Sequence, residues 1–250
     1  MKNSNPLFLV IAVGAVGYFF VSSKNKKVST PKNKQKIPPP KIDFTYEEFI
    51  INPDNLPLNE LPLIIGFHGL GSRGKNLIGL FQNFEQPAIF AFPNGPKPWK
   101  SSWYSWWELR SKTEKQHELS LDMKDVTVNY IKPIIMNLDH KYNPKKIIIT
   151  GHSQGGMATL SAATMLPSYI DGAVAVSGWL PEELQNNFDK PVYIIHGSKD
   201  NVVYFDRTKN WIENLNDQNV TWIPIENAGH SVVNNENLYN AWINSIYDIM

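Results

Sequence analysis

The sequence has no cysteine among its 250 residues. Disulfide bonds, thiolate metal sites, a cysteine nucleophile and lipid attached to cysteine are therefore excluded. The formal net charge at pH 7 is only +1, and no basic stripe runs through the body of the chain, so we expect no nucleic-acid partner. The glycine clusters are not followed by the G-K-[ST] signature that a phosphate-binding P-loop requires.

What the sequence does contain is typical of a globular protein. Hydrophobic residues make up 42% of the chain and aromatic residues make up 12%. These proportions are sufficient to bury a core, and the length suits one large domain or two small ones.

The charge-free run LFLVIAVGAVGYFFV lies near the N-terminus. Counted as residues 7–23, it approaches the lower limit of about 17 residues for crossing a bilayer. Only Lys2 precedes this run, whereas six lysines follow it within residues 24–36. Because excess positive charge marks the cytoplasmic side, we expect residues 1–23 to be a single-pass membrane anchor with the rest of the chain in the cytoplasm.

A cleaved signal peptide is the competing interpretation of this segment. Val21-Ser22-Ser23 supplies small residues for a cleavage site, and the protein would then be secreted or periplasmic. Residues 24–40, KNKKVSTPKNKQKIPPP, contain almost no large apolar residue and end in three prolines. We therefore expect an extended linker that tethers a domain at residues 41–250. The lysines of this linker either contact anionic headgroups or are simply solvated.

From residue 41 onward, short apolar segments alternate with segments of helical periodicity. The apolar runs predict strands at residues 61–67, 88–92, 146–150, 172–176, 191–195 and 220–225. Helical spacing predicts helices at residues 119–138, 157–165, 205–215 and 238–249, with Pro133 placed to kink the first. This alternation implies a mostly parallel sheet covered by helices on both faces, whose sites form beyond the carboxyl ends of the strands.

Residues 151–155 read GHSQG and lie between a predicted strand and a predicted helix. The serine of a G-x-S-x-G pattern occupies a sharp, strained turn, where side chains at the glycine positions would clash. The Ser153 hydroxyl would then stand clear of the sheet as a nucleophile, with the backbone N–H of Gln154 directed at a developing oxyanion. A turn without chemistry is the alternative, because so short a motif also arises by chance.

A serine nucleophile needs a base, and in sheets of this kind the chain order is serine, then acid, then histidine. His230 is the candidate base because it lies in a loop after the last predicted strand. His196 is also downstream, but it ends a strand and we expect it to pack there. We expect a structural role for His152, which lies within the turn itself.

The acid that orients the histidine is expected at a strand end between the serine and the base. Asp200 has this position, whereas Asp206 falls within a predicted helix and Asp189 lies at the wrong end of the strand. The HGLGS loop after the first inner strand is expected to supply the second oxyanion donor, the N–H of Leu70. We expect His68 to anchor that loop by hydrogen bonds.

Six segments, in this order, resemble the phospholipase/carboxylesterase family, which includes the acyl-protein thioesterases. They read FHGLGS, FPNGP, TGHSQGGM, VAVSGWLP, PVYIIHGSKDNVV and ENAGHSV, and they span about residues 60–245. The resemblance implies an α/β-hydrolase fold, with a mostly parallel central sheet and helices on both faces. It also implies a catalytic triad of Ser153, Asp200 and His230 and an oxyanion hole formed by Leu70 and Gln154.

Two features depart from the family that the chain resembles. Its members lack an anchor, and the segment KPWKSSWYSWWELR is richer in tryptophan than expected. Trp103, Trp106 and Trp107 either line an acyl or aryl pocket, form a lid near the membrane, or pack beneath the loop as core. We expect Trp103 and Trp107, together with Trp179 and Val202, to contact the substrate.

These observations predict a serine hydrolase that cleaves small-molecule acyl esters or thioesters, of the carboxylesterase, lysophospholipase or acyl-thioesterase type. Ser153 attacks the carbonyl, His230 takes the proton and Asp200 holds the imidazole, so an acyl-enzyme forms without a metal or other cofactor. A polyester or peptide hydrolase with the same triad is one alternative. A membrane-tethered binding protein that has kept the fold and lost activity is the other.

Overall fold

The computed structural model describes residues 38–100, 102–108 and 116–250. The predicted anchor at residues 1–23 and nearly all of the predicted linker at residues 24–40 lie outside the described residues. Within the part that is described, no helix combines the length and the apolar character needed to cross a membrane.

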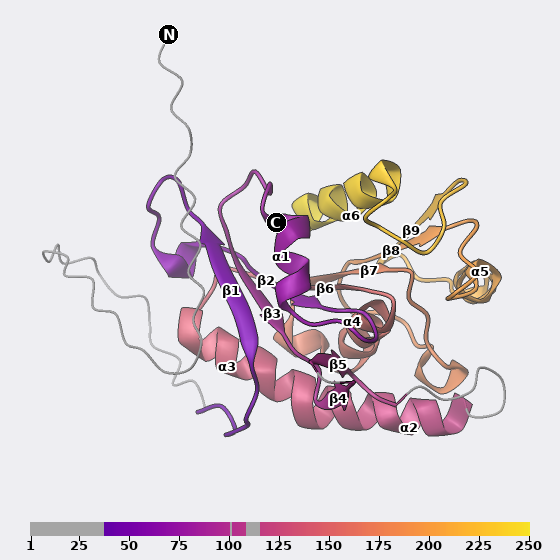
Figure 1. Ribbon diagram of the computed structural model, residues 1–250, viewed down its shortest axis with the longest axis horizontal. Helices are drawn as coiled ribbons and strands as arrows, with labels where there is room; N and C mark the ends of the chain where they lie inside the picture. Colours follow the sequence, from indigo (N-terminus) through magenta and orange to yellow (C-terminus); the bar gives the residue numbers. More distant parts are fainter. Residues whose placement is uncertain (1–37, 101, 109–115) are drawn as a thin grey trace, which may run out of the picture.

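A seven-stranded sheet forms the centre of the molecule (Figure 1). Its strands are β1 Tyr46–Ile51, β2 Leu63–Phe67, β3 Ala88–Pro93, β6 Ile147–His152, β7 Gly172–Val176, β8 Val192–Gly197 and β9 Val220–Ile225. They lie in the order β1-β3-β2-β6-β7-β8-β9, and only β1 runs antiparallel to its neighbour. A separate hairpin consists of β4 (Lys97–Trp99) and β5 (Trp103–Ser105). The carboxyl ends of the parallel strands therefore meet at one edge of the sheet.

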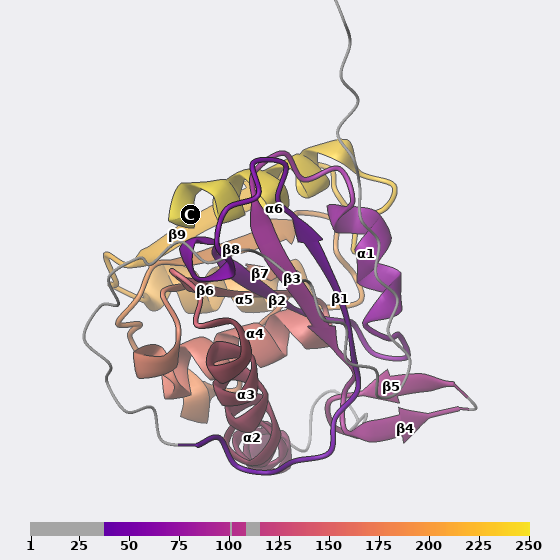
Figure 2. The same cartoon turned by 90° about the vertical axis from the view of Figure 1, so that its left-hand side faces the viewer.

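Helices cover both faces of this sheet (Figure 1 and Figure 2). The helices on one face are α1 (Lys75–Phe81) and α6 (Glu236–Ile249). Those on the other face are α2 (Gln116–Val126), α3 (Lys132–Tyr142), α4 (Gln154–Met165) and α5 (Phe205–Asn214). Short 3₁₀ turns occur at Leu58–Glu60, Pro167–Tyr169 and Glu182–Leu184.

Two hydrophobic clusters hold the helices to the sheet, one on each face. One cluster contains Phe81 of α1 and Trp242 of α6. The other contains Ile135 of α3, Leu160 of α4 and Trp211 of α5. Because the central strands are buried on both faces, their sequences are unbroken apolar runs rather than alternating patterns.

The segment predicted as one helix at residues 119–138 forms α2, a π-helical turn at Thr127–Ile131, and α3 without a break. The N–H of Lys132 donates to the carbonyl of Thr127, five residues back. Pro133 has no N–H to donate and cannot continue the regular α-helical pattern. The proline that we expected to kink the helix is therefore preceded directly by a π-helical turn.

All six predicted strands are present, and their ends differ from the prediction by at most two residues. Strand β1, the β4–β5 hairpin and helix α1 were not predicted. Strand β1 is an edge strand whose residues are mostly half-buried, so its sequence YEEFII mixes charged and apolar residues. Helix α1 has only seven residues, too few for a clear helical periodicity.

Candidate active site

Ser153 occupies the sharp turn between β6 and α4. Its backbone angles are φ 59° and ψ −122°, a combination that residues with a side chain rarely adopt. The turn is held by hydrogen bonds from the Ser153 N–H to Val176 O of β7, at 2.9 Å, and from the Met157 N–H to Ser153 O, at 3.0 Å. Backbone strain at a polar residue that is held so firmly is typical of a functional position.

Glycine is required on both sides of Ser153. A Cβ at Gly151 would lie 2.4 Å from the carbonyl oxygen of Gly155, and a Cβ at Gly155 would lie 2.0 Å from the carbonyl oxygen of Phe67. These opposing atoms belong to the backbone of packed elements and cannot move aside to relieve the clash. The steric explanation predicted for the G-x-S-x-G pattern is confirmed.

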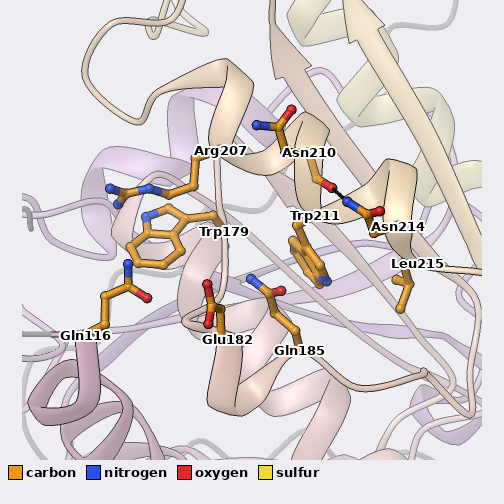
Figure 3. A pocket seen from close by; sticks show the side chains of 9 residues that line it. All are labelled: Gln116, Trp179, Glu182, Gln185, Arg207, Asn210, Trp211, Asn214 and Leu215. Carbon is orange, nitrogen blue, oxygen red and sulfur yellow. Dashed lines mark hydrogen bonds between the residues drawn. The ribbon is translucent and has the colours of Figure 1, made fainter.

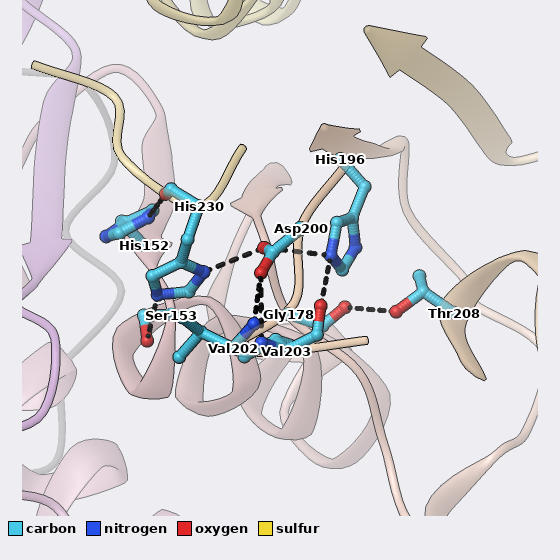
Figure 4. A network of polar contacts seen from close by, with 9 residues as sticks. All are labelled: His152, Ser153, Gly178, His196, Asp200, Val202, Val203, Thr208 and His230. Carbon is cyan, nitrogen blue, oxygen red and sulfur yellow. Dashed lines mark hydrogen bonds and ion pairs between the residues drawn. The ribbon is translucent and has the colours of Figure 1, made fainter. Parts of the chain in front are cut away.

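Ser153, His230 and Asp200 form a continuous series of hydrogen bonds (Figure 4). His230 Nδ1 lies 2.7 Å from Asp200 Oδ2, so its N–H donates to the carboxylate. His230 Nε2 is then the unprotonated nitrogen, and it accepts the hydroxyl proton of Ser153 at an N···O distance of 3.0 Å. The structure thus brings together the three residues that the sequence predicted as nucleophile, base and orienting acid.

Asp200 is buried at the end of β8 and is surrounded by hydrogen-bond donors. Its Oδ1 accepts from the backbone N–H groups of Val202, at 2.9 Å, and Val203, at 3.0 Å. Burial opposes ionisation, but the hydrogen bonds from His196, His230 and the Val202 N–H outweigh it and hold the pKa of this carboxyl well below its ordinary value. Asp200 therefore carries a negative charge beside His230 across the ordinary pH range.

The other candidate acids and histidines have different positions. Asp206 lies in the first turn of α5, and Asp189 is exposed ahead of β8, at its amino end. His196 is buried at the end of β8, as expected, but it also contacts Asp200: its Nε2 lies 3.2 Å from Asp200 Oδ2. This second contact is not predicted above, although His196 and Asp200 are only four positions apart in HGSKD.

His152 supports the loop that carries His230. Its Nε2–H donates to the backbone carbonyl of His230 at 2.7 Å, and the two rings lie 4.7 Å apart between centroids. Burial, with a contribution from the nearby His230, lowers the pKa of His152 to about 4, so its ring is neutral at pH 7. The structural role predicted for His152 agrees with these contacts.

The loop after β2 lies directly against Ser153. A Cβ at Gly69 would be 3.5 Å from the Cβ of Ser153. His68 fixes this loop, since its Nδ1–H donates to Gly69 O at 2.8 Å and its Nε2 accepts the N–H of Gly95 at 2.9 Å. Burial lowers the pKa of His68 to about 4 and keeps the ring neutral. The predicted anchoring of the loop by His68 is confirmed, and Leu70 follows Gly69 in this loop.

The side chain of Gln154 joins the first turn of α4 to the tryptophan-rich segment. Its Oε1 accepts the N–H of Trp106 at 2.9 Å, and its Nε2 donates to the carbonyl of Trp107 at 3.0 Å. The indole N–H of Trp106 donates to His68 O at 2.8 Å. Both tryptophans belong to the hydrophobic core, which is the third of the arrangements considered for this segment.

Two of the other residues expected to contact substrate are exposed, whereas Trp179 is buried. Trp103, in β5, is 45% exposed, and Val202, two residues after Asp200, is 52% exposed. The hairpin that carries Trp103 is joined to the loop after β2 by hydrogen bonds between Tyr104 and the backbone of Gly71 and Ser72. Trp103 is therefore carried by a hairpin joined to the loop after β2, and Val202 lies in the turn after β8, so both segments meet the edge of the sheet that carries the triad.

Trp179 lines a groove of about 580 Å³ between α5 and the segment that follows β7 (Figure 3). The guanidinium of Arg207 lies over its ring, 4.3 Å from the centroid. The Thr208 hydroxyl donates to Gly178 O at 3.1 Å and ties α5 to the Trp179 segment. The triad residues are not among the groove's lining residues, which are Gln116, Trp179, Glu182, Gln185, Arg207, Asn210, Trp211, Asn214 and Leu215.

The described residues contain no group of three or more histidine, aspartate and glutamate side chains arranged to hold a metal ion. The polar groups at the carboxyl edge of the sheet are instead connected to one another, through His230, Asp200 and His196. Such an arrangement can activate a hydroxyl and take up its proton.

Known relatives share both sequence and fold with this chain. Acyl-protein thioesterase 1 of Candida albicans is 29% identical over 202 residues, which cover 69% of this chain and 86% of that protein. Carboxylesterase SOBER1 of Arabidopsis thaliana is 27% identical over 202 residues, which cover 72% of this chain and 88% of that protein. The crystal structure of esterase PE8 has a TM-score of 0.69 and 20% identity, covering 84% of this chain and all of that one.

The likeness to solved structures confirms the predicted fold, a mostly parallel sheet with helices on both faces. The family model described as phospholipase/carboxylesterase matches residues 47–241, from β1 into α6. This match extends over most of the chain and includes every strand of the central sheet and all three triad positions. The chain therefore belongs to the phospholipase/carboxylesterase family of α/β-hydrolases.

Proposed function

We propose that this chain is a serine hydrolase that cleaves carboxylic esters or thioesters. The observation that carries the proposal is the hydrogen-bonded series from Ser153 through His230 to Asp200, with contacts of 3.0 and 2.7 Å. The strained backbone of Ser153 adds support, because it presents the hydroxyl at the carboxyl edge of the sheet. The thioesterase and carboxylesterase named among the relatives support the same class of reaction.

In the first half of the reaction, Ser153 Oγ attacks the carbonyl carbon and its proton passes to His230 Nε2. Asp200 holds the imidazole in the tautomer whose Nε2 is free, and its charge stabilises the imidazolium. The oxyanion is stabilised by the backbone N–H groups of Leu70 and Gln154 and by the N-terminal end of α4. His230 then gives the proton to the departing alcohol or thiol, and the acyl group remains on Ser153.

The second half of the reaction releases the acyl group. Water enters beside His230, which takes a proton from it while the oxygen attacks the acyl carbonyl. The same backbone donors stabilise the second oxyanion. As this intermediate collapses, the proton returns from His230 to Ser153 Oγ, and the carboxylic acid leaves. No electrons are exchanged with a further group in either half.

Exposed apolar side chains near the triad suit an acyl substrate. We assign Trp103 and Val202 to the walls that contact the acyl or leaving group, because both are exposed on segments joined to the carboxyl edge of the sheet, the hairpin β4–β5 and the turn after β8. Trp179 is assigned to a more distant contact, through its groove beside α5. Trp107 is buried, so it acts through packing and through its carbonyl contact with Gln154.

The test is hydrolysis of p-nitrophenyl esters from acetate to palmitate, together with labelling by a fluorophosphonate. We expect Ser153→Ala to lower kcat by roughly 10⁴–10⁶-fold and to abolish labelling. Ser168→Ala is the matched control, because Ser168 is exposed in the 3₁₀ turn Pro167–Tyr169, and this variant is expected to keep full activity.

The results of hydrolysis and labelling distinguish the proposed function from its alternatives. Activity that is lost only in Ser153→Ala supports the proposal, and the preferred chain length measures the acyl site. Labelling of Ser153 without ester hydrolysis, but with cleavage of peptides or polyesters, would replace the substrate class. A wild-type chain that is neither labelled nor active would favour the binding-protein alternative.

We also propose that residues 7–23 anchor the catalytic domain to a membrane, with the domain on the cytoplasmic side. The support is the uncharged apolar run and the six lysines that follow it within residues 24–36. Mass spectrometry of the mature N-terminus tests this proposal. An intact N-terminus in the membrane fraction is expected, whereas cleavage near Ser23 would indicate a secreted or periplasmic enzyme.

A further inference from the structure

His196 is a second histidine in contact with Asp200, and its side chain is completely buried (Figure 4). Its Nε2 lies 3.2 Å from Asp200 Oδ2 and 2.9 Å from the carbonyl oxygen of Val203. Both of these oxygens are acceptors, so Nε2 carries the proton and donates to them. Asp200 Oδ2 is also the oxygen that accepts from His230. One carboxylate oxygen therefore receives hydrogen bonds from two histidines.

The other nitrogen of His196 faces apolar surroundings. Nδ1 is buried and has no hydrogen-bond partner among the described residues. Aromatic rings enclose the imidazole: Phe205 of α5 lies 5.8 Å away and Trp222 of β9 lies 6.3 Å away, between ring centroids. His196 therefore donates to Asp200 through Nε2, while Nδ1 faces these aromatic rings.

His196 also closes the turn that follows Asp200. The carbonyl of Val203 accepts from His196, while the N–H of the same residue donates to Asp200 Oδ1 at 3.0 Å. His196 thus holds Oδ2 directly and holds Oδ1 through Val203. The orientation of the carboxylate relative to His230 depends on both contacts.

We propose that His196 is a positioning residue of this hydrolase, a buried hydrogen-bond donor that aligns Asp200 with His230 and limits the charge that Oδ2 presents to the imidazolium. The inference rests on the proposed function, because it concerns the same triad. His196 is completely buried, so it acts through Asp200 and does not contact the substrate.

Several side chains surround His196 and Asp200, and those that titrate can affect the pH dependence of kcat/KM. His230, from the loop after β9, contacts Asp200, and His152, from the end of β6, contacts His230. Burial and the nearby His230 lower the pKa of His152 to about 4, so it stays neutral in the range where a serine hydrolase works. Helix α5 and strand β9 face His196 with the uncharged rings of Phe205 and Trp222. Among the described residues, the titratable groups in contact with one another around His196 are therefore His152, Asp200 and His230.

Two variants distinguish the effect of losing the hydrogen-bond donor at residue 196 from the effect of altered packing. In His196→Gln, the side-chain amide reaches the position of Nε2 and keeps an N–H directed at Asp200. His196→Leu fills a similar space without a donor. We expect the Leu variant to lose roughly 10- to 100-fold in kcat with little change in KM, the range typical when an orienting partner is removed. The Gln variant is expected to restore most of the activity.

The pH profile of kcat/KM gives a readout that a purely structural role would leave unchanged. With one donor removed, Asp200 Oδ2 directs its full charge at His230 and favours the imidazolium. The acidic limb of the Leu variant is therefore expected to move to higher pH, and that of the Gln variant to stay near the wild type.

A second readout does not depend on activity. The proton between His230 Nδ1 and Asp200 Oδ2 is expected as a low-field resonance in the ¹H NMR spectrum of the full chain. The chemical shift of this resonance should change in His196→Leu and should be close to the wild-type value in His196→Gln. Thermal unfolding verifies that each variant is folded, and His196→Asn, whose amide is too short to reach Asp200, replaces the Leu variant if that variant does not fold.

The outcomes distinguish this inference from the proposed function. A wild-type chain that hydrolyses esters, with a Leu variant that keeps the wild-type kcat, pH profile and resonance, overturns the inference alone. Equal impairment of the Leu and Gln variants also overturns it, since packing would then explain the effect. A wild-type chain without hydrolysis or fluorophosphonate labelling overturns the proposed function, and the positioning role with it.

Discussion

At the scale of single residues, the position of Ser153 depends on residue 155 being a glycine, which has no side chain. A Cβ at Gly155 would lie 2.0 Å from Phe67 O, where the start of α4 meets the end of β2. We expect Gly155→Ala to displace the turn, to lower the free energy of unfolding by about 3 kcal/mol, and to reduce activity. Urea unfolding and ester hydrolysis measure the two effects.

The matched control is Gly79→Ala. Gly79 is exposed in α1, and a Cβ there would meet no atom within 4 Å. This substitution is expected to be neutral or to stabilise the protein by up to about 1 kcal/mol, because alanine favours a helix over glycine. Equal stability of the two variants would contradict the steric argument at Gly155.

Asp200 gives a prediction about pH. Its pKa lies well below the ordinary value, because the hydrogen bonds from His196 and His230 outweigh burial. A depressed pKa contributes stability above the ordinary carboxyl value of about 3.9, and that stability is lost as the pH falls toward the folded-state value. We therefore expect Asp200→Asn to be less stable than the wild type at pH 7. The difference in the free energy of unfolding between the two should become smaller below about pH 4.

Urea unfolding followed by tryptophan fluorescence, at pH 7, 5 and 3.5, measures this difference. Asp189→Asn is the control, because Asp189 is exposed ahead of β8, and this variant is expected to unfold like the wild type. A difference for Asp200→Asn that does not change with pH would contradict the prediction. The same variant should lose kcat on the order of 10⁴-fold, because an amide N–H facing His230 Nδ1 favours the tautomer whose Nε2 is protonated.

The residues with a direct chemical role were predictable, because each has a type and a position that the chemistry requires. Ser153, Asp200 and His230 follow strand ends in the required order, and the fold brings them together. The contact between His196 and Asp200 depends on the path of the turn after β8, and the clamp formed by the Gln154 side chain depends on how the tryptophan-rich segment folds back. The spacing of four residues in HGSKD allows the first contact without specifying it, and the second contact leaves no pattern along the chain.

At the scale of elements, helix α6 bounds the loop that carries His230. Its N-cap is Asn235, whose side chain accepts the N–H of Leu238 at 2.9 Å. We expect Asn235→Ala to lower the free energy of unfolding by about 1 kcal/mol, because a helix N-terminal donor loses its partner. Asn235→Asp keeps the acceptor and places a negative charge at the positive end of the helix, so this control should retain stability.

Thermal unfolding of both variants measures the effect of the cap. A stability of Asn235→Ala equal to that of Asn235→Asp would show that the cap contributes nothing. Activity gives a second comparison, because His230 lies only five residues before Asn235. Fraying of the first turn of α6 would loosen that loop, so we expect the Ala variant to lose some activity and the Asp variant to lose none.

The same scale explains which elements the sequence could predict. The central strands are buried on both faces, and their unbroken apolar runs are visible without a structure. Strand β1 is paired on one side only, at the edge of the sheet, and needs few apolar residues. The π-helical turn at Thr127–Ile131 has the same composition as the helices beside it, so only Pro133 indicated an irregularity.

At the scale of the whole molecule, the parallel topology explains why the site can be assembled from distant segments. The strands β2, β6 and β8 run in the same direction, so the loop after each of them reaches the same edge of the sheet. The oxyanion loop, the nucleophile and the orienting acid follow these three strands. The base follows β9 and reaches the site because His152 and Asp200 hold its loop.

The described helices and strands all follow the predicted linker at residues 24–40. Both hydrophobic clusters, the sheet and the triad lie within residues 42–250. We therefore expect a shortened chain of residues 38–250 to unfold within about 2 °C of the full chain and to keep its kcat/KM on short-chain esters. A shortened chain that is unstable or inactive would contradict the predicted domain boundary.

The location of the two chains is expected to differ. The uncharged run at residues 7–23 is the segment proposed to enter the bilayer, so the full chain should sediment with membranes after a high-salt wash. High salt screens any attraction between the lysines and anionic lipids and leaves only hydrophobic insertion. The shortened chain should remain in the supernatant. Release of the full chain by salt alone would mean that the lysines within residues 24–36, rather than residues 7–23, hold the enzyme at the surface.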